Sequence, residues 1–287
     1  MQLTHAKRQQ PNIINLHLEF IRRTSIGRAM FTVKDVKLGS RISNLHLTLS
    51  QQVEGSLEYV NEVEGYVTIT NLSSEDGPSF DTGYQILPPP LPASIEHLHQ
   101  NMDQNYVTRG KEPFADFRRA GQNVKMCLVR PAKRPANHPK AMVDQWVQLT
   151  PLRDNKRAGK WTNDALGFVV DIFPQLVELY VNPKLEMSVL DPSLTDAQIS
   201  SLKDAMGGQR KLWYPTLLLN LDVKKLLPAE GVDWLFVRVQ AKSIARGRFD
   251  LSIEVLDVFG DLVALSTHSS LVVDSSRNTS RGKKGKL

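Results

Sequence analysis

The chain has 287 residues, of which 41% are hydrophobic and 23% charged, with a net charge of +6 and a single cysteine. This composition excludes a chain that is disordered throughout, and one cysteine excludes an internal disulfide and any multi-cysteine metal site. No apolar run reaches the roughly 18 residues that a membrane-spanning helix needs, and the N-terminus lacks a signal-peptide layout. We therefore expect a cytoplasmic protein that does not contact a membrane.

Much of the excess positive charge lies in the C-terminal tail. Residues 277–286 hold five basic side chains and no acidic one, which predicts a basic, disordered tail over residues 275–287. Such tails are usually solvated, so we do not expect a nucleic-acid partner. The final Gly285-Lys286-Leu287 only approximates the Ser-Lys-Leu peroxisomal signal and is a weak indication of that compartment.

Period-two alternation predicts an antiparallel meander in the first part of the chain. Strands are expected at residues 16–20, 29–36, 45–49 and 65–72. Residues 73–113 change character and include a short polyproline stretch at residues 88–92, which we interpret as a structural spacer.

The second half has one long helical pattern followed by strands. A strand at residues 124–129 precedes a proline-rich basic loop at residues 130–140, which suggests a boundary between units at 1–140 and 141–274. Apolar residues then recur at helical spacing over residues 163–180, where Thr162 or Asn163 can cap the helix and Pro174 predicts a kink. A short helix at 195–206 and four strands are expected beyond it, at residues 216–223, 234–243, 249–256 and 262–273.

An internal repeat indicates the architecture. Residues 11–18 resemble residues 215–222, and each copy is followed by a glycine-led strand, a basic glycine turn and a period-two strand. Two copies of one helix-plus-antiparallel-sheet unit are the simplest account, and they give an α+β fold.

The two copies are unequal at their N-terminal ends. Only ten residues precede Pro11, and at 1.5 Å per residue they make a helix of about 15 Å. We expect the first unit to lack its central helix, with its apolar face partly covered by residues 1–10 and the 91–120 segment, or else by a partner chain. The chain is then expected to be a shortened version of a longer protein.

Three stretches, residues 161–171, 213–222 and 260–268, resemble the fungal thioesterase-like proteins related to acyl-CoA thioesterase II, over nearly the whole chain. The resemblance implies a double hotdog, which is two units of a helix wrapped by a curved antiparallel sheet. It also implies hydrolysis of an acyl-CoA, or another acyl thioester, to a free acid and coenzyme A. No metal and no cofactor are expected.

The resemblance also implies a site. In that family an aspartate on the second hotdog helix, a threonine on the following strand and a glutamine on the last strand position the hydrolytic water. These positions fall on Asp171, Thr216 and His268 of this chain. Histidine in place of glutamine departs from the bacterial pattern.

Elementary chemistry is consistent with these roles but leaves a structural interpretation open. A carboxylate among Val, Ile and Phe side chains has a raised pKa, which suits a general base, and a backbone N–H at the helix kink could stabilise the oxyanion. Taken singly, Asp171 lies on a polar helical stripe, Thr216 is an ordinary strand threonine, and His268 alternates with apolar neighbours as surface residues do. The three residues carry weight only if they meet in one place.

Other chemistries have weaker sequence support. There is no Gly-x-Ser-x-Gly nucleophile motif, Cys127 lies in an apolar run typical of a buried residue, and His97 and His99 lack zinc-motif spacing. Four basic turn residues either contact the phosphates of coenzyme A or are merely solvated: Lys224, Lys225, Arg246 and Arg248.

Two alternative functions remain open. A non-catalytic acyl-binding or scaffold protein is favoured by the short first repeat and by His268. A hotdog dehydratase is least favoured, because the chain lacks a histidine-led helix motif. A homo-oligomer is compatible with either alternative.

Overall fold

The computed structural model describes residues 8–110, 119–150, 159–181 and 212–275, together with residues 183, 190–191, 195, 197–198 and 200–201. The strands in this part of the chain are β1 (Asn12–Phe20), β2 (Met30–Leu38), β3 (Ser43–Gln52), β4 (Tyr59–Thr70), β5 (Tyr106–Thr108), β6 (Val124–Val129), β7 (Met142–Leu149), β8 (Leu212–Trp213), β9 (Thr216–Val223), β10 (Leu235–Gln240), β11 (Ile244–Ala245), β12 (Arg248–Leu256), β13 (Leu262–Leu271) and β14 (Val273–Asp274). The α-helices are short: α2 (Ile95–Gln100), α3 (Leu166–Val169) and α4 (Glu178–Val181). Short 3-10 helices occur at η2 (Leu72–Ser74), η3 (Arg119–Asn123), η4 (Pro131–Lys133) and η5 (Asn163–Ala165).

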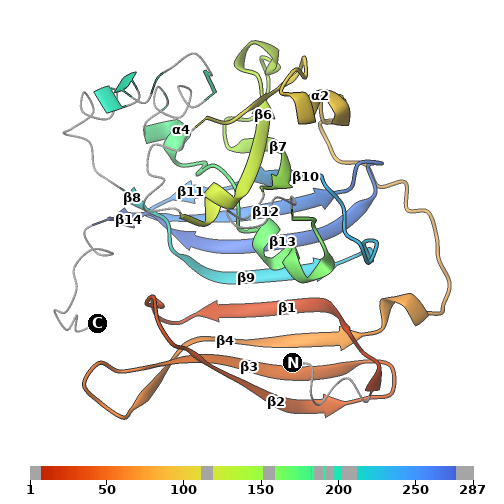
Figure 1. Cartoon of the computed structure of the whole chain (residues 1–287), viewed down its shortest axis with the longest axis vertical. Coiled ribbons are helices and arrows are strands. Elements are labelled where there is room, and N and C mark those ends of the chain that lie inside the picture. Colours follow the sequence, from red (N-terminus) through yellow and green to blue (C-terminus); the bar gives the residue numbers. More distant parts are fainter. Residues whose placement is uncertain are drawn as a thin grey trace.

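Antiparallel pairing joins most of these strands into one large sheet. Its order is β2-β3-β4-β1-β9-β13-β12-β10-β7-β6-β5, with β11 added beside β12. Figure 1 shows the N-terminal strands in red and orange beside the C-terminal strands in cyan and blue, with β1 next to β9. β8 and β14 form a separate small pair.

The internal repeat of the sequence is realised as a mirrored strand order about the β1–β9 junction. Reading outward, the N-terminal half runs β1, β4, β3, β2, and the C-terminal half runs β9, β13, β12, β10. Leu16 of β1 lies opposite Leu221, and Leu18 lies opposite Leu219. The repeated first strands therefore meet each other at the centre of the sheet, and the predicted α+β double hotdog is confirmed.

The two halves differ in what covers them. No α-helix is described among residues 8–94, and the expectation that the first unit lacks its central helix stays a prediction, because residues 1–7 lie outside the described part of the chain. Leu45, Val67 and Ile69 still form a small buried cluster, whereas Phe31 on the edge strand β2 is 75% exposed.

The predicted cover for the first unit is wrong in one respect. Leu91, Ile95 and Leu98 pack against Trp146 and Trp234 of the C-terminal half rather than over β1–β4. Gln10, in contrast, does lie on the first unit, because its side chain donates to the carbonyls of Gly39 and Ser40.

The strand pairing divides the chain at a place other than residue 140. β6 pairs with β5 and with β7, and β7 pairs with β10, so residues 106–149 extend the C-terminal half of the sheet. The loop at residues 130–140 therefore joins two neighbouring strands of one unit and is not a linker between units. Except for residue 275, the tail predicted at residues 275–287 lies outside the described residues, as does most of the helix predicted at 195–206.

The helix predicted over residues 163–180 is not continuous. It ends after Val169 and resumes only at Glu178, because Pro174 has no N–H to donate and its ring clashes with the carbonyl four residues earlier. The apolar positions are nevertheless buried as predicted: Leu166, Val169, Ile172 and Leu176 belong to the main core beneath the sheet. Packing against the sheet thus follows the apolar pattern, while proline sets the backbone.

None of the helices in the described part of the chain is both long and apolar enough to cross a membrane.

Candidate active site

Asp171 lies in the turn that follows α3. The N–H of Val170 donates to the carbonyl of Leu166, and the N–H of Asp171 donates to that of Phe168, so this turn continues the last helical hydrogen bonds. The buried amide of Gln145 on β7 donates to the carbonyl of Ile172 at 2.8 Å and ties the turn to the sheet. These bonds occupy the N–H groups of Val170 and Asp171, which are therefore not free to act as the oxyanion donors expected at a helix kink.

His268 lies on the core-facing side of β13, although its sequence pattern is typical of a surface residue. It is only 2% exposed, and its ring packs 6.3 Å from that of Phe173, measured between centroids. Nδ1 of His268 is 3.9 Å from Oδ1 of Asp171. The structure thus brings together two residues that are 97 positions apart in the sequence (268 minus 171).

The protein shifts the pKa values of these two groups in opposite directions. Burial lowers the pKa of His268 to about 4, so its imidazole is neutral near pH 7. Desolvation raises the pKa of Asp171 to about 6. The Asp171 side chain is 54% exposed, so solvent screening reduces this rise below that of an enclosed carboxyl. Asp171 is therefore the stronger base of the pair and is largely ionised at pH 7.

A β-bulge places Thr216 on the same face of the sheet as His268. Ser269 pairs with Leu218, but the next residue, Ser270, pairs with Thr216, so β9 carries one extra residue at Leu217. Residues directly opposite each other in an antiparallel pair share a face, and Ser270 shares its face with His268, two residues away. Without the bulge, simple alternation would turn Thr216 to the outer face. The sheet therefore presents Thr216 and His268 on the side from which Asp171 approaches.

A cavity of about 230 Å³ adjoins the pair through Asp171 and Phe173. Its described lining combines apolar side chains with polar groups: Arg109, Ala120, Gly121, Met126, Asp171, Ile172, Phe173, Gln175, Leu212, Trp213 and Tyr214. The hydroxyl of Tyr214 donates to Glu178 at 2.5 Å, which fixes one wall. A cavity that is lined by both apolar and polar side chains and has a carboxylate in its wall suits a ligand with an apolar portion and a reactive polar group.

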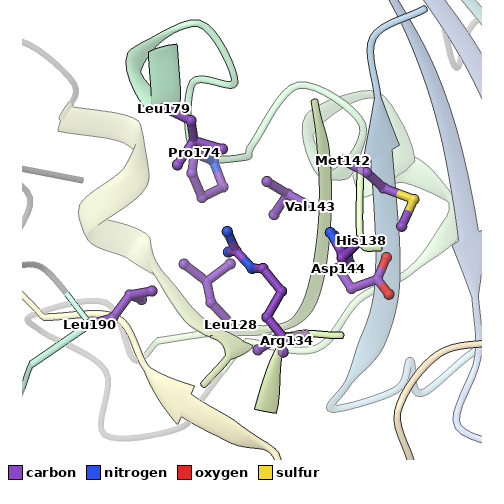
Figure 2. A pocket seen from close by; sticks show the side chains of 10 residues that line it. Leu128, Arg134, His138, Met142, Val143, Asp144, Pro174, Leu179 and Leu190 are labelled. Carbon is purple, nitrogen blue, oxygen red and sulfur yellow. The ribbon is translucent and has the colours of Figure 1, made fainter. Parts of the chain in front are cut away.

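A second cavity lies beside β7, and its lining includes none of the predicted site residues Asp171, Thr216 and His268. Figure 2 shows Arg134 and His138 there among Leu128, Val143, Pro174 and other apolar side chains. Its volume of about 20 Å³ is enough for roughly one water molecule and too small for an acyl group.

The other sequence candidates have structural roles. Cys127 is 1% exposed, and burial raises the pKa of its thiol, which makes it a poor nucleophile. Nε2 of His99 accepts a hydrogen bond from Trp234 at 3.0 Å. Lys225 is engaged by Asp257 and Asp261, both at 2.6 Å, and is not free to meet a phosphate. Within the described residues, no group of three or more His, Cys, Asp or Glu side chains could hold a metal ion.

Two residues of the site carried no usable sequence signal. Gln145 is fully buried within an apolar strand that the sequence pattern did not predict, and Ser266 contacts His268 from two positions earlier on β13. Polar residues at inward positions of a strand are the only hint that sequence could have given, and recognising them requires the register first.

The fold and the site define a double-hotdog protein with a carboxylate in the wall of a cavity and a buried imidazole beside that carboxylate. The family model described as the acyl-CoA thioesterase C-terminal domain matches residues 85–272, and the model of the N-terminal domain matches residues 1–70. The chain therefore belongs to the acyl-CoA thioesterase family. The gap between the two matches, residues 71–84, lies after β4, which is the last strand of the N-terminal half, and before β5, which belongs to the C-terminal half.

Known relatives agree with this assignment. The chain is 33% identical over 289 residues to the thioesterase-like protein TwmA of Talaromyces wortmannii, a match that covers 96% of this chain and 80% of the relative. A thioesterase II candidate from Thermobifida fusca has a similar fold, with a TM-score of 0.62 and 19% identity over 94% of this chain and 81% of its own. The acyl-CoA thioesterase II TesB2 of Mycobacterium marinum gives a TM-score of 0.54 with 14% identity, over 93% of this chain and 82% of its own. At these identities the two structures show the fold alone.

Proposed function

We propose that this protein is a thioesterase that hydrolyses an acyl-CoA, or a related acyl thioester, to a free acid and a thiol. The observation that supports this most directly is the 3.9 Å approach of His268 to Asp171, a carboxylate that lines a cavity of about 230 Å³. Both residues occupy positions at which the family resemblance implies water-positioning groups.

Asp171 is the general base in this proposal. Its pKa is raised above the usual range by desolvation, so the carboxylate is ionised near neutral pH yet basic enough to accept a proton from water. His268, whose pKa is lowered to about 4, is the weaker base and orients the water as a neutral hydrogen-bonding group.

The spacing of the two groups suits a single water molecule. Hydrogen bonds of about 2.8 Å from one water oxygen to two acceptors 3.9 Å apart subtend an angle of about 90°, which is near the angle between the hydrogens of water. Thr216, on the same face as His268, is proposed to contact the same water or the thioester carbonyl through its hydroxyl.

The proposed reaction balances without a further reactant. The water oxygen attacks the thioester carbonyl carbon while Asp171 takes a proton, and the tetrahedral intermediate then releases its C–S bond. The thiolate of the leaving group takes the proton from Asp171, which leaves a carboxylic acid and a free thiol. The cavity beside Phe173 and Trp213 is proposed to hold the apolar part of the substrate.

Thiol release from a panel of acyl-CoAs of increasing chain length tests the proposal. We expect turnover by the wild-type chain, abolished or strongly reduced by Asp171→Asn. Asp164→Asn is the matched control, because Asp164 lies exposed seven residues earlier in the same segment. Absence of thiol release from every acyl-CoA would contradict the proposal. Saturable binding of an acyl-CoA without release would favour the alternative of a non-catalytic acyl-binding protein, with which His268 in place of glutamine is compatible.

A further inference from the structure

A buried hydrogen-bond chain runs from His268 through Ser266 to the neighbouring strand. Nε2 of His268 lies 3.1 Å from Oγ of Ser266, and Oγ of Ser266 donates to the backbone carbonyl of Asn220 on β9. Ser266 is 4% exposed and His268 2% exposed, so water does not compete freely for these groups.

The direction of this chain follows from its last member. A backbone carbonyl can only accept, so the single proton of the Ser266 hydroxyl is committed to Asn220. The oxygen of Ser266 then has only lone pairs to offer to His268. Nε2 must therefore carry the proton and donate it to Ser266.

The other ring nitrogen consequently has no proton. Burial keeps the imidazole neutral near pH 7, and a neutral imidazole that is protonated at Nε2 has a lone pair at Nδ1. Nδ1 is buried and has no hydrogen-bond partner in the structure, and the nearest acidic oxygen, Oδ1 of Asp171, is 3.9 Å away. The lone pair on this nitrogen therefore lies 3.9 Å from the Asp171 carboxylate, at a position that is closed to water in this structure.

We propose that Ser266 is a positioning residue that holds His268 in the Nε2–H tautomer, so that Nδ1 can accept one hydrogen of the attacking water once a bound substrate opens the contact between His268 and Asp171. The assignment of the tautomer stands by itself, while the role toward the water and the kinetic consequence rest on the proposed thioesterase function. The water gives its second hydrogen to Asp171, and its oxygen lone pair is left to face the thioester carbon.

The opposite tautomer fits the surroundings less well. A proton on Nδ1 would be a buried donor without a hydrogen-bond partner. Nε2 would then have to accept from Ser266, which would withdraw the hydroxyl from the carbonyl of Asn220. An imidazolium would leave the same unpaired Nδ1–H together with a buried charge.

Tautomers are measured directly by nitrogen NMR on protein labelled with ¹⁵N at histidine, with His268→Gln used to assign the signals of His268. In the wild-type chain we expect an Nε2–H imidazole with an unprotonated Nδ1. In Ser266→Ala we expect a mixture of the two tautomers, whereas Ser266→Thr, which keeps the hydroxyl, restores the wild-type spectrum. Ser269→Ala is the matched control, because it removes a hydroxyl from the outer face of the same strand.

The kinetic consequence is a change in kcat rather than in KM. We expect Ser266→Ala to lower kcat by about 10- to 100-fold with KM within about twofold, a smaller loss than a fixed wrong tautomer causes in a serine protease. Ser266→Thr and Ser269→Ala are expected to stay within about threefold of wild type in kcat, well short of that loss.

Two results would overturn the inference. One is a wild-type His268 that is protonated at Nδ1, and the other is a Ser266→Ala variant that keeps the Nε2–H tautomer and the wild-type kcat. A wild-type chain that releases no thiol would contradict the proposed function, and the NMR spectra would still decide the tautomer by themselves.

Discussion

Nδ1 of His268 lies 3.9 Å from Oδ1 of Asp171, yet the side chain of the histidine is 0% exposed and that of the aspartate 54%. The pair thus joins the rigid interior of the sheet to a surface that a substrate can reach. The core fixes the imidazole from one side, while the carboxylate meets solvent and ligand from the other. Desolvation disfavours the charged form of both groups, so it raises the pKa of the Asp171 carboxyl and lowers that of the His268 imidazole. The difference in exposure is the reason why each residue is expected to fail differently when it is replaced.

Replacing the base is expected to remove most of the activity. Asp171→Asn keeps the size of the side chain but cannot accept a proton, and general-base catalysis contributes about 10²- to 10⁴-fold to the rate. We therefore expect a fall of that size in kcat, with KM changed by less than about threefold. Steady-state thiol release measures both, with Asp164→Asn as the control. Wild-type kcat in Asp171→Asn would show that another group is the base.

The pH profile is expected to follow Asp171. The carboxylate is active only when ionised, and its pKa is raised to about 6, so kcat/KM should fall about tenfold per pH unit below that value and level off above it. Protonation of His268 enters only near pH 4. The profile is measured between pH 4.5 and 8 with one acyl-CoA. An inflection at the ordinary aspartate pKa near 4 would mean that desolvation at Asp171 is weaker than we infer.

Stability at acid pH is expected to depend on His268. Its pKa is about 4 in the folded chain and 6.5 as a free group, so the unfolded chain gains a proton first as the pH falls. The stability that comes from burying the neutral ring is present above pH 6.5 and is lost between pH 6.5 and 4, by about 3 kcal/mol at 1.36 kcal/mol per pKa unit. Asp171 has the opposite effect: because its pKa is raised in the folded chain, its protonation between about pH 6 and 4 favours the folded state, in the wild type and in every variant that keeps Asp171.

His268→Gln isolates the histidine contribution. Urea unfolding at pH 7 and at pH 4 should show that the difference in unfolding free energy, wild type minus variant, becomes about 3 kcal/mol less favourable to the wild type at the lower pH. An unchanged difference would show that His268 titrates normally in the folded chain.

The buried ion pair of Asp144 and Arg238 is expected to be sensitive to the loss of one partner. The two side chains are joined by hydrogen bonds of 2.6 and 2.7 Å and are 5% and 2% exposed, and Nη1 of Arg238 also donates to the carbonyl of Pro88. Arg238→Met leaves a buried carboxylate unpaired, which costs about 3–5 kcal/mol.

Chemical unfolding measures this cost against two comparisons. Lys160→Met breaks an exposed pair with Asp233 and should cost less than about 1 kcal/mol. The double variant Asp144→Leu with Arg238→Met should recover much of the loss, since it removes both charges. If Arg238→Met costs no more than Lys160→Met, the pair is better solvated than its burial indicates.

The first unit is expected to be stabilised by its small cluster and not by its edge strand. Leu45 is 0% exposed, so Leu45→Ala should cost about 2–5 kcal/mol. Phe31→Ser, at a position 75% exposed on β2, should change the free energy of unfolding by about 0.5 kcal/mol or less. A large effect of Phe31→Ser in the isolated chain would mean that another surface covers this strand in solution.

Much of the fold could be predicted from the sequence because the underlying signals are local. Alternation of apolar and polar residues located β9 at 216–223 and β6 at 124–129, and the repeat of residues 11–18 at 215–222 predicted two related units. The resemblance then pointed to Asp171 and His268, which the structure brings together. The apolar residues of the helix predicted at 163–180 are buried as expected, but the helix itself is interrupted. The spacing of apolar residues predicts burial, whereas it does not take account of the hydrogen bond that is lost at Pro174.

Other features were decided only by the tertiary structure. Sheet register assigned residues 106–149 to the C-terminal half, because hydrogen bonding between β6, β7 and β10 joins segments that the sequence places on both sides of a proline-rich loop. A single extra residue at Leu217 turned Thr216 to the face of His268, and strand alternation alone predicts the reverse. The apolar pattern and the repeat of the two units can be read directly from the order of residues. Which polar groups share a face, and which hydroxyl meets the imidazole, depended on pairing between strands far apart in the chain, because such pairing is set by the whole sheet and not by any one strand.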